Sequence, residues 1–217
     1  MNIFKKISIL KTIKDNKTVQ LKTYIEQSNQ NNNINLDINE RDEDGQYPLL
    51  WACDRNNKEI VKLLMNYANK KNITLILNDK DKDGNYPLLL ACHENNPEIV
   101  KLLMDYANQK NITLNLNDKD KISSSYPLYW GCCNNNSEIV ELLIDYANRN
   151  NVLLILNDKM GSTQDSNDLI VEEDYPLKHA IHGKDIRLIE LLVVYAHDHG
   201  INLDLDQNIK DVIVMEN

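Results

Sequence analysis

Residues 86–103 read YPLLLACHENNPEIVKLL, and this stretch decides the fold because it recurs along the chain. The tripeptide Tyr-Pro-Leu starts at Tyr47, Tyr86, Tyr126 and Tyr175. A motif Glu-Ile-Val-x-Leu-Leu follows the first three copies, and the degenerate stretch RLIELL follows the fourth. Self-similarity at a fixed period is typical of repeat proteins, so the chain is predicted to be an array of stacked units.

A third motif closes each unit and shows where the chain tolerates changes of length. It begins at Asn72, Asn111, Asn151 and Gly200, and once upstream at Asn33. The spacing from each Tyr to the next closing motif is always 25 residues, whereas the spacing from a closing motif to the next Tyr is 14, 14, 15 and 24. An inserted residue would rotate the apolar face of a packed helix, but a turn can absorb it. The sequence therefore predicts five units, with all length variation in the turns.

Each constant segment is predicted to hold two helices. Pro48 suits the first turn of a short helix, where its missing N–H costs nothing. That helix is predicted to end at Asn56, because Asn tolerates the left-handed conformation, and Asn57 is predicted to cap a second helix. In the second helix, Ile60, Leu63, Leu64 and Tyr67 recur at the amphipathic period.

These residues resemble the ankyrin repeat, whose unit is a turn plus two antiparallel helices with the signature Thr-Pro-Leu-His-x-Ala. The resemblance implies an all-α solenoid that binds other proteins. Three features depart from the family pattern. The unit is 39 or 40 residues long and rich in Asn, whereas the family unit has about 33 residues. Tyr replaces the usual Thr, so the side-chain cap of the first helix should be lost. The usual His is replaced by Leu50, Leu89, Tyr129 and Lys178.

The predicted organisation is a single array over residues 1–217. It comprises an N-terminal capping unit (1–39), units at 40–79, 80–118 and 119–158, a long acidic turn insertion (159–173), a last unit (174–206) and a tail (207–217). The tail carries Ile209, Val212, Ile213 and Val214, and either covers the last helix pair or docks onto something else.

Composition excludes several classes of protein. The formal net charge of the 217 residues is −9 and the sequence pI is near 5.0, which disfavours nucleic-acid binding. No apolar run approaches the ~20 residues that span a membrane, and the N-terminus lacks a signal peptide. Four cysteines without an export signal indicate a cytoplasmic, non-secreted protein. The 32 asparagines are interpreted as a bias of the genome more than a physical requirement.

No motif predicts catalysis, a cofactor or a metal. Asp79-x-Asp81-x-Asp83-Gly84 imitates the start of a calcium loop, but Leu90 stands where a bidentate Glu is needed. Cys53, Cys92 and Cys132 share one repeat position and are predicted to be small buried side chains. A zinc site made from His93, Cys133, His179 and His182 is disfavoured, because these residues are spread over three units.

Variation among the copies marks a predicted binding surface. In the ankyrin family, partners usually contact the turn tips and the exposed side of the first helix. Carried over residue by residue, the helix positions are Asp54, Arg55, His93, Glu94, Cys133, Asn134, His182 and Gly183. The turn-tip positions are Glu43, Gln46, Lys82, Asn85, Ile122 and Ser124. The alternative is that these are solvent-facing positions without a function.

The turn insertion adds Asp165, Asp168 and Glu172 to the predicted surface. Residues 161–217 carry 12 acidic against 4 basic residues, so a protein partner with a basic surface would be steered toward this end, unless the insertion only aids solubility. The predicted function is a non-catalytic, monomeric protein-binding module with no small-molecule substrate, nucleic acid or membrane as its partner. The alternative is an adaptor that recruits substrates to an enzyme complex such as a ubiquitin ligase.

Overall fold

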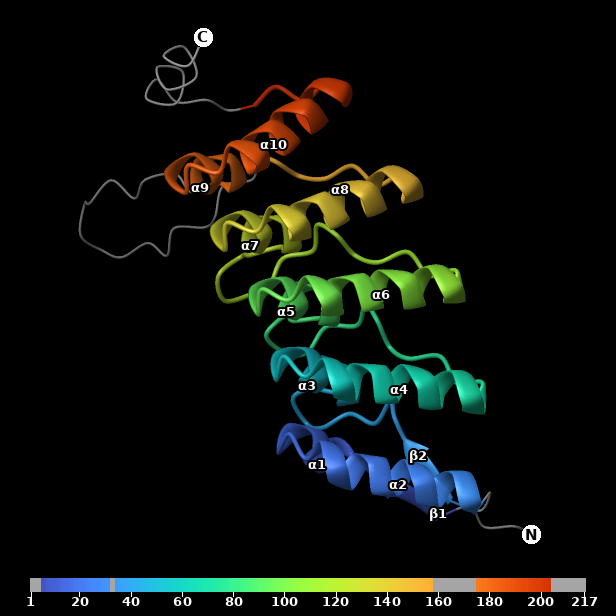
Figure 1. The fold of residues 1–217 in the computed structure, drawn as a ribbon. Helices are drawn as coiled ribbons and strands as arrows, with labels where there is room; N and C mark the ends of the chain where they lie inside the picture. The colour runs from blue at the N-terminus through green and yellow to red at the C-terminus, as the bar shows by residue number, and fades with distance from the viewer. Residues whose placement is uncertain (1–4, 32–33, 158–174, 204–217) are drawn as a thin grey trace, which may run out of the picture. The chain divides into compact units, whose positions relative to one another are not determined.

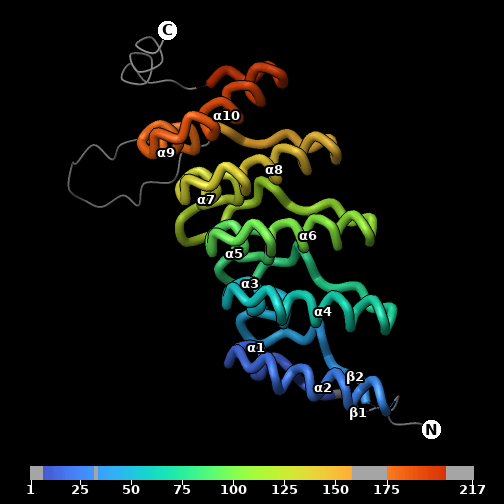
Figure 2. Tube along the Cα trace, viewed as in Figure 1, coloured from blue at the N-terminus to red at the C-terminus, as the bar shows by residue number. Residues whose placement is uncertain are grey.

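The protein is described here by a computed structural model that covers residues 5–31, 34–157 and 175–203. The chain divides into two compact bodies, which we call the N-terminal body (Met1–Asn115) and the C-terminal body (Leu116–Asn217). Each body is built from pairs of helices (Figures 1 and 2). In every pair a short helix, the first helix, precedes a longer one, the second helix. The predicted insertion and tail, 159–173 and 207–217, lie outside the described residues.

The N-terminal body contains three helix pairs. They are α1 (Leu10–Lys14) with α2 (Thr18–Gln30), α3 (Pro48–Asp54) with α4 (Lys58–Lys71), and α5 (Pro87–His93) with α6 (Pro97–Lys110). First helices pack on first helices in the order α1, α3, α5, and second helices pack in the order α2, α4, α6. This sequential stacking confirms the predicted helical repeat fold for this body.

The C-terminal body repeats the arrangement with two described pairs. They are α7 (Pro127–Cys133) with α8 (Ser137–Asn150), and α9 (Pro176–His182) with α10 (Ile186–Asp198). Helix α7 packs on α9, and α8 packs on α10 (Figure 1). The core between the helices consists of apolar side chains at equivalent positions, such as Leu128, Leu143, Leu177 and Leu192, which are buried.

A small parallel sheet is the one departure from the all-α expectation in the described residues. Strand β1 (Lys5–Ser8) pairs with β2 (Ile34–Asp37) in the register Lys5 to Ile34. The first pair also lacks Tyr-Pro, and the carboxylate of Glu40 takes over the start of α1. It accepts hydrogen bonds from the backbone N–H groups of Ile9 and Leu10, at 2.6 and 2.7 Å.

The tyrosine before each proline does not cap its helix, as predicted. Tyr47 is the N-cap residue of α3 but forms no side-chain cap hydrogen bond. Its buried hydroxyl instead donates to the backbone carbonyl of Asp79 in the next turn, at 2.8 Å. The replacement of Thr by Tyr therefore exchanges a bond within one helix pair for a bond between successive pairs.

Asparagine has a defined conformational role at three positions of the repeat. In the three middle pairs, α3 to α8, the second residue after the first helix adopts positive φ, and so does the C-cap residue of the second helix. These residues are Asn56, Asn72, Asn95, Asn111, Asn135 and Asn151, with φ between 51° and 55°. Asn57, Asn96 and Asn136 cap the second helices by accepting a hydrogen bond from a backbone N–H group three residues ahead.

Asparagines also join successive pairs through their side-chain amides. Asn78 Nδ2 donates to the carbonyl of Thr113 at 2.8 Å, and its Oδ1 accepts from the N–H of Asn115 at 3.1 Å. Asn39 makes the same two bonds to residues 74 and 76, and Asn117 makes them to residues 153 and 155. Because a side-chain amide offers both donors and an acceptor, it pairs with a carbonyl and an N–H group on either side of one residue of the neighbouring segment.

Candidate protein-binding surface

In the N-terminal body the predicted surface lies at the ends of α3 and α5. Cys53 and Cys92 are fully buried, whereas Arg55 and His93, one or two residues further along the chain, are exposed. Asp54 and Glu94 are half-buried, and each faces its sequence neighbour: Arg55 Nε lies 3.8 Å from Asp54, and His93 Nδ1 lies 2.9 Å from Glu94. Since α3 packs on α5, these four side chains come from adjacent helices.

In the C-terminal body the equivalent positions lie at the ends of α7 and α9. Cys133 and His182 are exposed, and Asn134 is half-buried. Gly183 is not a freely variable position, because a Cβ atom there would clash with the side-chain amide of Asn135 on the neighbouring pair. The close approach of two pairs, and not surface variation, accounts for this glycine.

The six predicted turn-tip residues fall into two groups. Glu43, Lys82 and Ile122 are exposed, and Ile122 retains 73% of its accessible surface. Gln46, Asn85 and Ser124 are half-buried parts of the turns themselves. The N–H of Gln46 donates to Asp42, the N–H of Asn85 donates to Asp81, and Ser124 adopts a positive φ of 57°. The first group is thus accessible to a partner, whereas the second group shapes the turns.

The aspartates that resembled a calcium loop are occupied by the backbone of their own turns. Asp81 Oδ1 accepts hydrogen bonds from the N–H groups of Asp83 and Asn85, at 3.0 and 2.8 Å. Asp42 does the same for residues 44 and 46. Among the described residues, no three His, Cys, Asp or Glu side chains come together in a way that could hold a metal ion.

The turn at residues 120–125 also uses an aspartate to bind its own backbone, and here two of the donor residues are serines. Asp120 is buried, and its carboxylate accepts from the N–H groups of Ile122, Ser123 and Ser125, at 2.6 to 2.8 Å. Burial acts to raise the pKa of this carboxyl. The hydrogen bonds from Ser123, Ile122 and Ser125 outweigh burial, so the pKa of Asp120 lies below its ordinary value.

Sequence reasoning missed Trp51, which lies one turn before Arg55 on α3. Lys14 Nζ of α1 lies 4.6 Å from the centroid of the Trp51 ring, and the Arg55 guanidinium carbon lies 4.8 Å from it. The indole therefore lies beside two cations, and each contact is a cation–π interaction. Trp51 itself is buried, with 9% of its surface exposed.

The second tryptophan occupies the same repeat position in the C-terminal body. Trp130 contacts Tyr129 edge-on, with ring centroids 5.5 Å apart, and Tyr129 contacts the ring of His179 on α9 at 5.1 Å. His179 Nε2 also lies 3.3 Å from the Tyr129 hydroxyl. One signal could have found this cluster. The chain has only two tryptophans, and both stand four residues before a predicted surface position.

The cysteines behave as predicted at the repeat-equivalent position. All four are free thiols, and Cys53, Cys92 and Cys132 are buried, whereas Cys133 is exposed. Burial raises the pKa of the three buried thiols, which keeps them protonated and unreactive.

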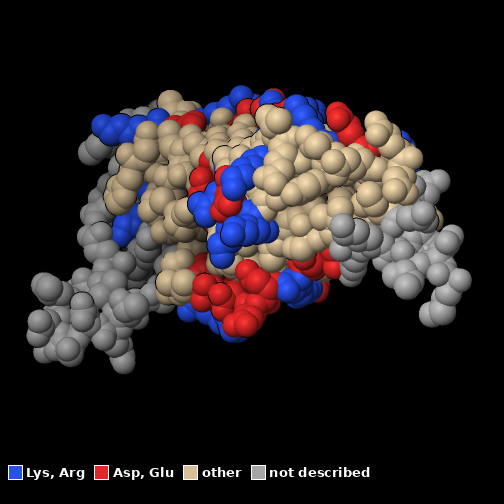
Figure 3. All heavy atoms as spheres, turned by 90° about the horizontal axis from the view of Figure 1, so that it is seen from below, with Lys and Arg blue, Asp and Glu red and all other residues tan. Residues whose placement is uncertain are grey.

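Charge on the described surface is mixed in sign. On the face drawn in Figure 3, Lys and Arg side chains lie beside Asp and Glu side chains, with large neutral areas between them. The predicted acidic residues Asp165, Asp168 and Glu172 lie outside the described residues. The acidic surplus of residues 161–217 is therefore known from the sequence and is not visible on the described surface.

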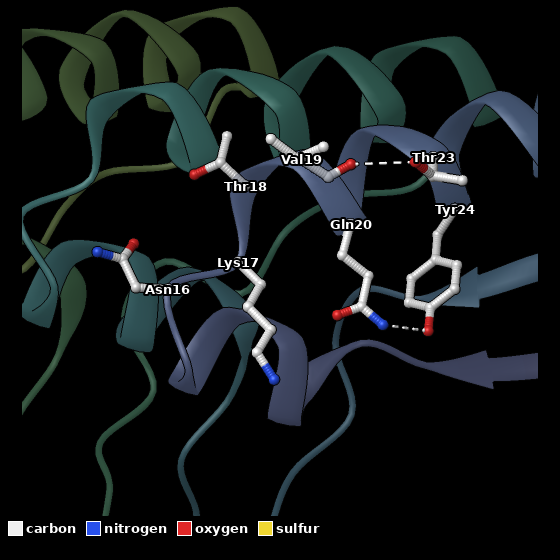
Figure 4. Close-up of a pocket in the computed structure, with 7 residues that line it drawn as sticks. All are labelled: Asn16, Lys17, Thr18, Val19, Gln20, Thr23 and Tyr24. Carbon is white, nitrogen blue, oxygen red and sulfur yellow. Dashed lines mark hydrogen bonds between the residues drawn. The ribbon is translucent and has the colours of Figure 1, made fainter.

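One hollow of about 730 Å³ lies along the start of α2 (Figure 4). It is lined by Asn16, Lys17, Thr18, Val19, Gln20, Thr23 and Tyr24. Gln20 donates to the Tyr24 hydroxyl across it at 2.7 Å. It is an open groove on one helix, with no concentration of catalytic groups.

The repeat matches a known family pattern. The family pattern described as "Ankyrin repeats (3 copies)" matches residues 13–118 and 71–153. A stretch of 33 residues is 52% identical to the acyl-CoA-binding domain-containing protein 6 of Bos taurus. That stretch is 15% of this chain and covers 12% of the bovine protein. No helix in the described residues has both the length and the apolar character needed to cross a membrane.

Proposed function

Because the chain belongs to the ankyrin-repeat family, we propose that it is a non-catalytic module that binds another protein through the ends of its first helices and its exposed turn tips. One observation carries this proposal. At equivalent positions the framework side chains are buried and alike, whereas the next residue varies in type: it is Asp54, His93, Cys133 or His182, and the last three are exposed. A scaffold that holds its core constant while its surface varies is suited to recognition.

The two tryptophan clusters are proposed as the anchors of this surface. Tryptophan, tyrosine and arginine dominate the binding energy of protein interfaces. Trp51 lies with Arg55 and Lys14, and Trp130 lies with Tyr129 and His179, so each body carries such a group. A partner side chain placed against them would be held by a surface that is already ordered, which lowers the entropy cost of association.

The partner is proposed to be a protein with a basic surface. The support is the sequence of residues 161–217, with 12 acidic residues against 4 basic ones, including Asp165, Asp168 and Glu172. Charge of one sign steers an oppositely charged partner and makes the association rate depend on salt. A monomer in the reducing interior of the cell is part of the same proposal, since all four cysteines are free thiols. The bovine protein's name concerns acyl-CoA, and nothing in the described residues supports carrying that ligand over.

Affinity capture with the full chain tests the function. The chain is immobilised and exposed to lysate of the organism that produces it, beside the variant Arg55→Ala/His93→Ala/His182→Ala. The matched control changes exposed residues on second helices, Lys62→Ala/Asp105→Ala/Asn148→Ala. We expect a protein that binds the wild type and the control but not the surface variant, and that binds again when purified.

Two outcomes would contradict the proposal. Equal loss of the captured protein in both variants would place binding elsewhere, and equal retention would make the first-helix surface irrelevant. Substituting Asp165→Asn, Asp168→Asn and Glu172→Gln separately tests the charge argument, because it should slow association at low salt and change little at high salt. Capture of a subunit of a ubiquitin ligase would favour the adaptor alternative.

A further inference from the structure

The first and the last second helix of the described chain, α2 and α10, differ in chemical character. In α4 the side chains Ile60, Leu64 and Tyr67 face α2 and are 0%, 0% and 2% exposed. The equivalent residues of α2, which have no described helix pair in front of them, are Gln20, Tyr24 and Gln27. Gln20 and Gln27 are exposed and Tyr24 is half-buried. The N-terminal end is thus polar, as the terminal unit of a repeat array must be to stay soluble.

The C-terminal end has the opposite character. Met65 of α4 and Ile144 of α8 face the following second helix and are 6% and 9% exposed. The equivalent residue of α10 is Val193, which is 39% exposed. Val194, beside it, is 57% exposed and stands where α4 and α8 have Asn66 and Asp145.

A third position extends this apolar face along α10. Lys58 begins α4, and its ammonium group lies 2.5 Å from Glu98 of the following helix, so this position borders the next pair. In α10 it is Ile186, which is 61% exposed. We call Ile186, Ile189, Val193 and Val194 the terminal face. Two of its four positions are polar in the internal helix α4. Polar Glu190 and His197 lie beside the terminal face, where α4 has Lys62 and Asn69, two residues that line a groove with α6.

We infer that residues 204–217 of this chain cover the terminal face. Leu205, Ile209, Val212 and Ile213 recur at i, i+4, i+7 and i+8, the spacing of one apolar helical stripe, among Asp204, Asp206, Gln207, Asn208 and Asp211. A helix of 14 residues is about 21 Å long, which matches the roughly 20 Å of α10. The segment therefore has the pattern and the length to cover this face.

The exit path of the chain leads toward the terminal face. The N–H of Ile73 bonds to the carbonyl of Ala68 after α4, and the N–H of Ile201 bonds in the same way to Ala196 after α10, both at 2.8 Å. Asn157 then donates to the carbonyl of Asn202 at 2.6 Å, as Asn39 does to Thr74. In the N-terminal body this path carries the chain to α5, which packs on α3. After α10 the described chain follows the start of the same path.

Thiol labelling of the full chain tests the inference. In a Cys133→Ser background the three remaining native cysteines are buried, so an introduced thiol reports its own accessibility. Val193→Cys reports on the terminal face, and Val19→Cys is the matched control, because Val19 on α2 is 78% exposed. A tail docked about 90% of the time slows labelling at 193 about tenfold relative to an undocked chain.

The tail is then changed in two matched ways. Ile209→Asn/Ile213→Asn removes two residues of the stripe, whereas Gln207→Asn/Asp211→Asn introduces the same residue at the same spacing on the opposite side. We expect the first pair of changes to raise labelling at 193 about tenfold, and the second to leave it unchanged. Labelling at 19 should respond to neither.

Two results would overturn the inference. Labelling at 193 as fast as at 19 in the unaltered tail would mean that nothing covers the terminal face. Slow labelling that ignores the tail changes but speeds up on dilution, together with a dimeric mass, would assign the face to a second copy of the chain. Neither result bears on partner binding through the first helices, so the proposed function is tested independently.

Discussion

At the scale of single residues, asparagine is the residue that adopts the left-handed backbone conformation at the ends of three second helices. Asn72, Asn111 and Asn151 each end a second helix at φ near 54°, a conformation that costs most L-residues about 1–2 kcal/mol. Asparagine lowers that cost because its short side chain hydrogen-bonds locally. It also supplies a donor and an acceptor, which glycine does not.

Replacing Asn111 separates these two contributions. Asn111→Ala should destabilise the protein by about 1 kcal/mol, because alanine pays the full cost of the left-handed conformation. Asn111→Gly should stay within about 0.5 kcal/mol of the wild type, since glycine adopts positive φ freely. Urea unfolding of the three proteins checks this, and an alanine variant as stable as the glycine variant would contradict it.

Asp120 should make the stability of the protein depend on acid. Its folded-state pKa is lowered, so its contribution to stability is fully present above the unfolded-state pKa near 3.9 and is lost as the pH falls through the folded-state pKa. Asp120→Asn keeps the shape but does not titrate. Below pH ~4 the wild type should lose stability more steeply than Asp120→Asn, and parallel curves from urea unfolding at each pH would refute this.

At the scale of the elements, the ion pairs between successive second helices differ in which of the two helices carries the positive charge. Lys22 of α2 pairs with Glu59 of α4, which joins the fifth residue of one helix to the second residue of the next. Glu141 of α8 and Arg187 of α10 occupy the same two positions with the charges exchanged. Helix α10 stacked on α2 would thus bring Arg187 against Lys22. The reversal favours the pairing of α10 with α8.

A charge swap measures this preference. Glu141→Lys should destabilise the protein by about 0.5–1 kcal/mol, because it replaces an attraction by a repulsion at a partly exposed site. Adding Arg187→Glu should restore most of the loss. Both effects should shrink in 1 M salt, where such pairs are screened. Urea unfolding at two salt concentrations gives the coupling, and a double variant no more stable than the single one would show that the two side chains do not interact.

At the scale of the whole molecule, the joint between Asn151 and Tyr175 is the connection whose length differs most from the other joints. Its spacing is 24 residues, against 14 or 15 in the other joints that precede a Tyr-Pro. Deleting residues 161–170 would return it to 14, a length that the chain already uses. Closing a loop of 14 instead of 24 residues changes the free energy by only about 0.5 kcal/mol.

We therefore expect this deletion to leave the helical circular dichroism intact and the free energy of unfolding within about 0.5 kcal/mol. A contrasting deletion of Asp145 alone, within α8, should unfold the C-terminal body, because one missing residue turns the apolar face of the helix by about 100°. Loss of helix in the first variant, or its retention in the second, would contradict the conclusion that the turns tolerate changes of length and the helices do not.

The sequence by itself determined the repeat, the helix pairs and most of their ends. Proline at the first helical turn, asparagine at positive φ and asparagine at the N-cap all act within about four residues, so the printed sequence is enough to place them. The buried cysteines followed from the same period. The side-chain amide bonds of Asn39 and Asn78 did not follow from the sequence, because they run to residues about 35 positions away.

The tertiary structure alone decided which side chains meet across successive pairs. Lys14 and Arg55 come together over Trp51 from different pairs, Glu40 caps a helix that begins 30 residues earlier, and Gly183 lies close to a side chain of the preceding pair. The contrast between a polar first end and an apolar last end also emerged only there. Such contacts depend on how one helix pair is rotated and set against the next, and the hydrophobic period that predicts the helices does not specify that rotation.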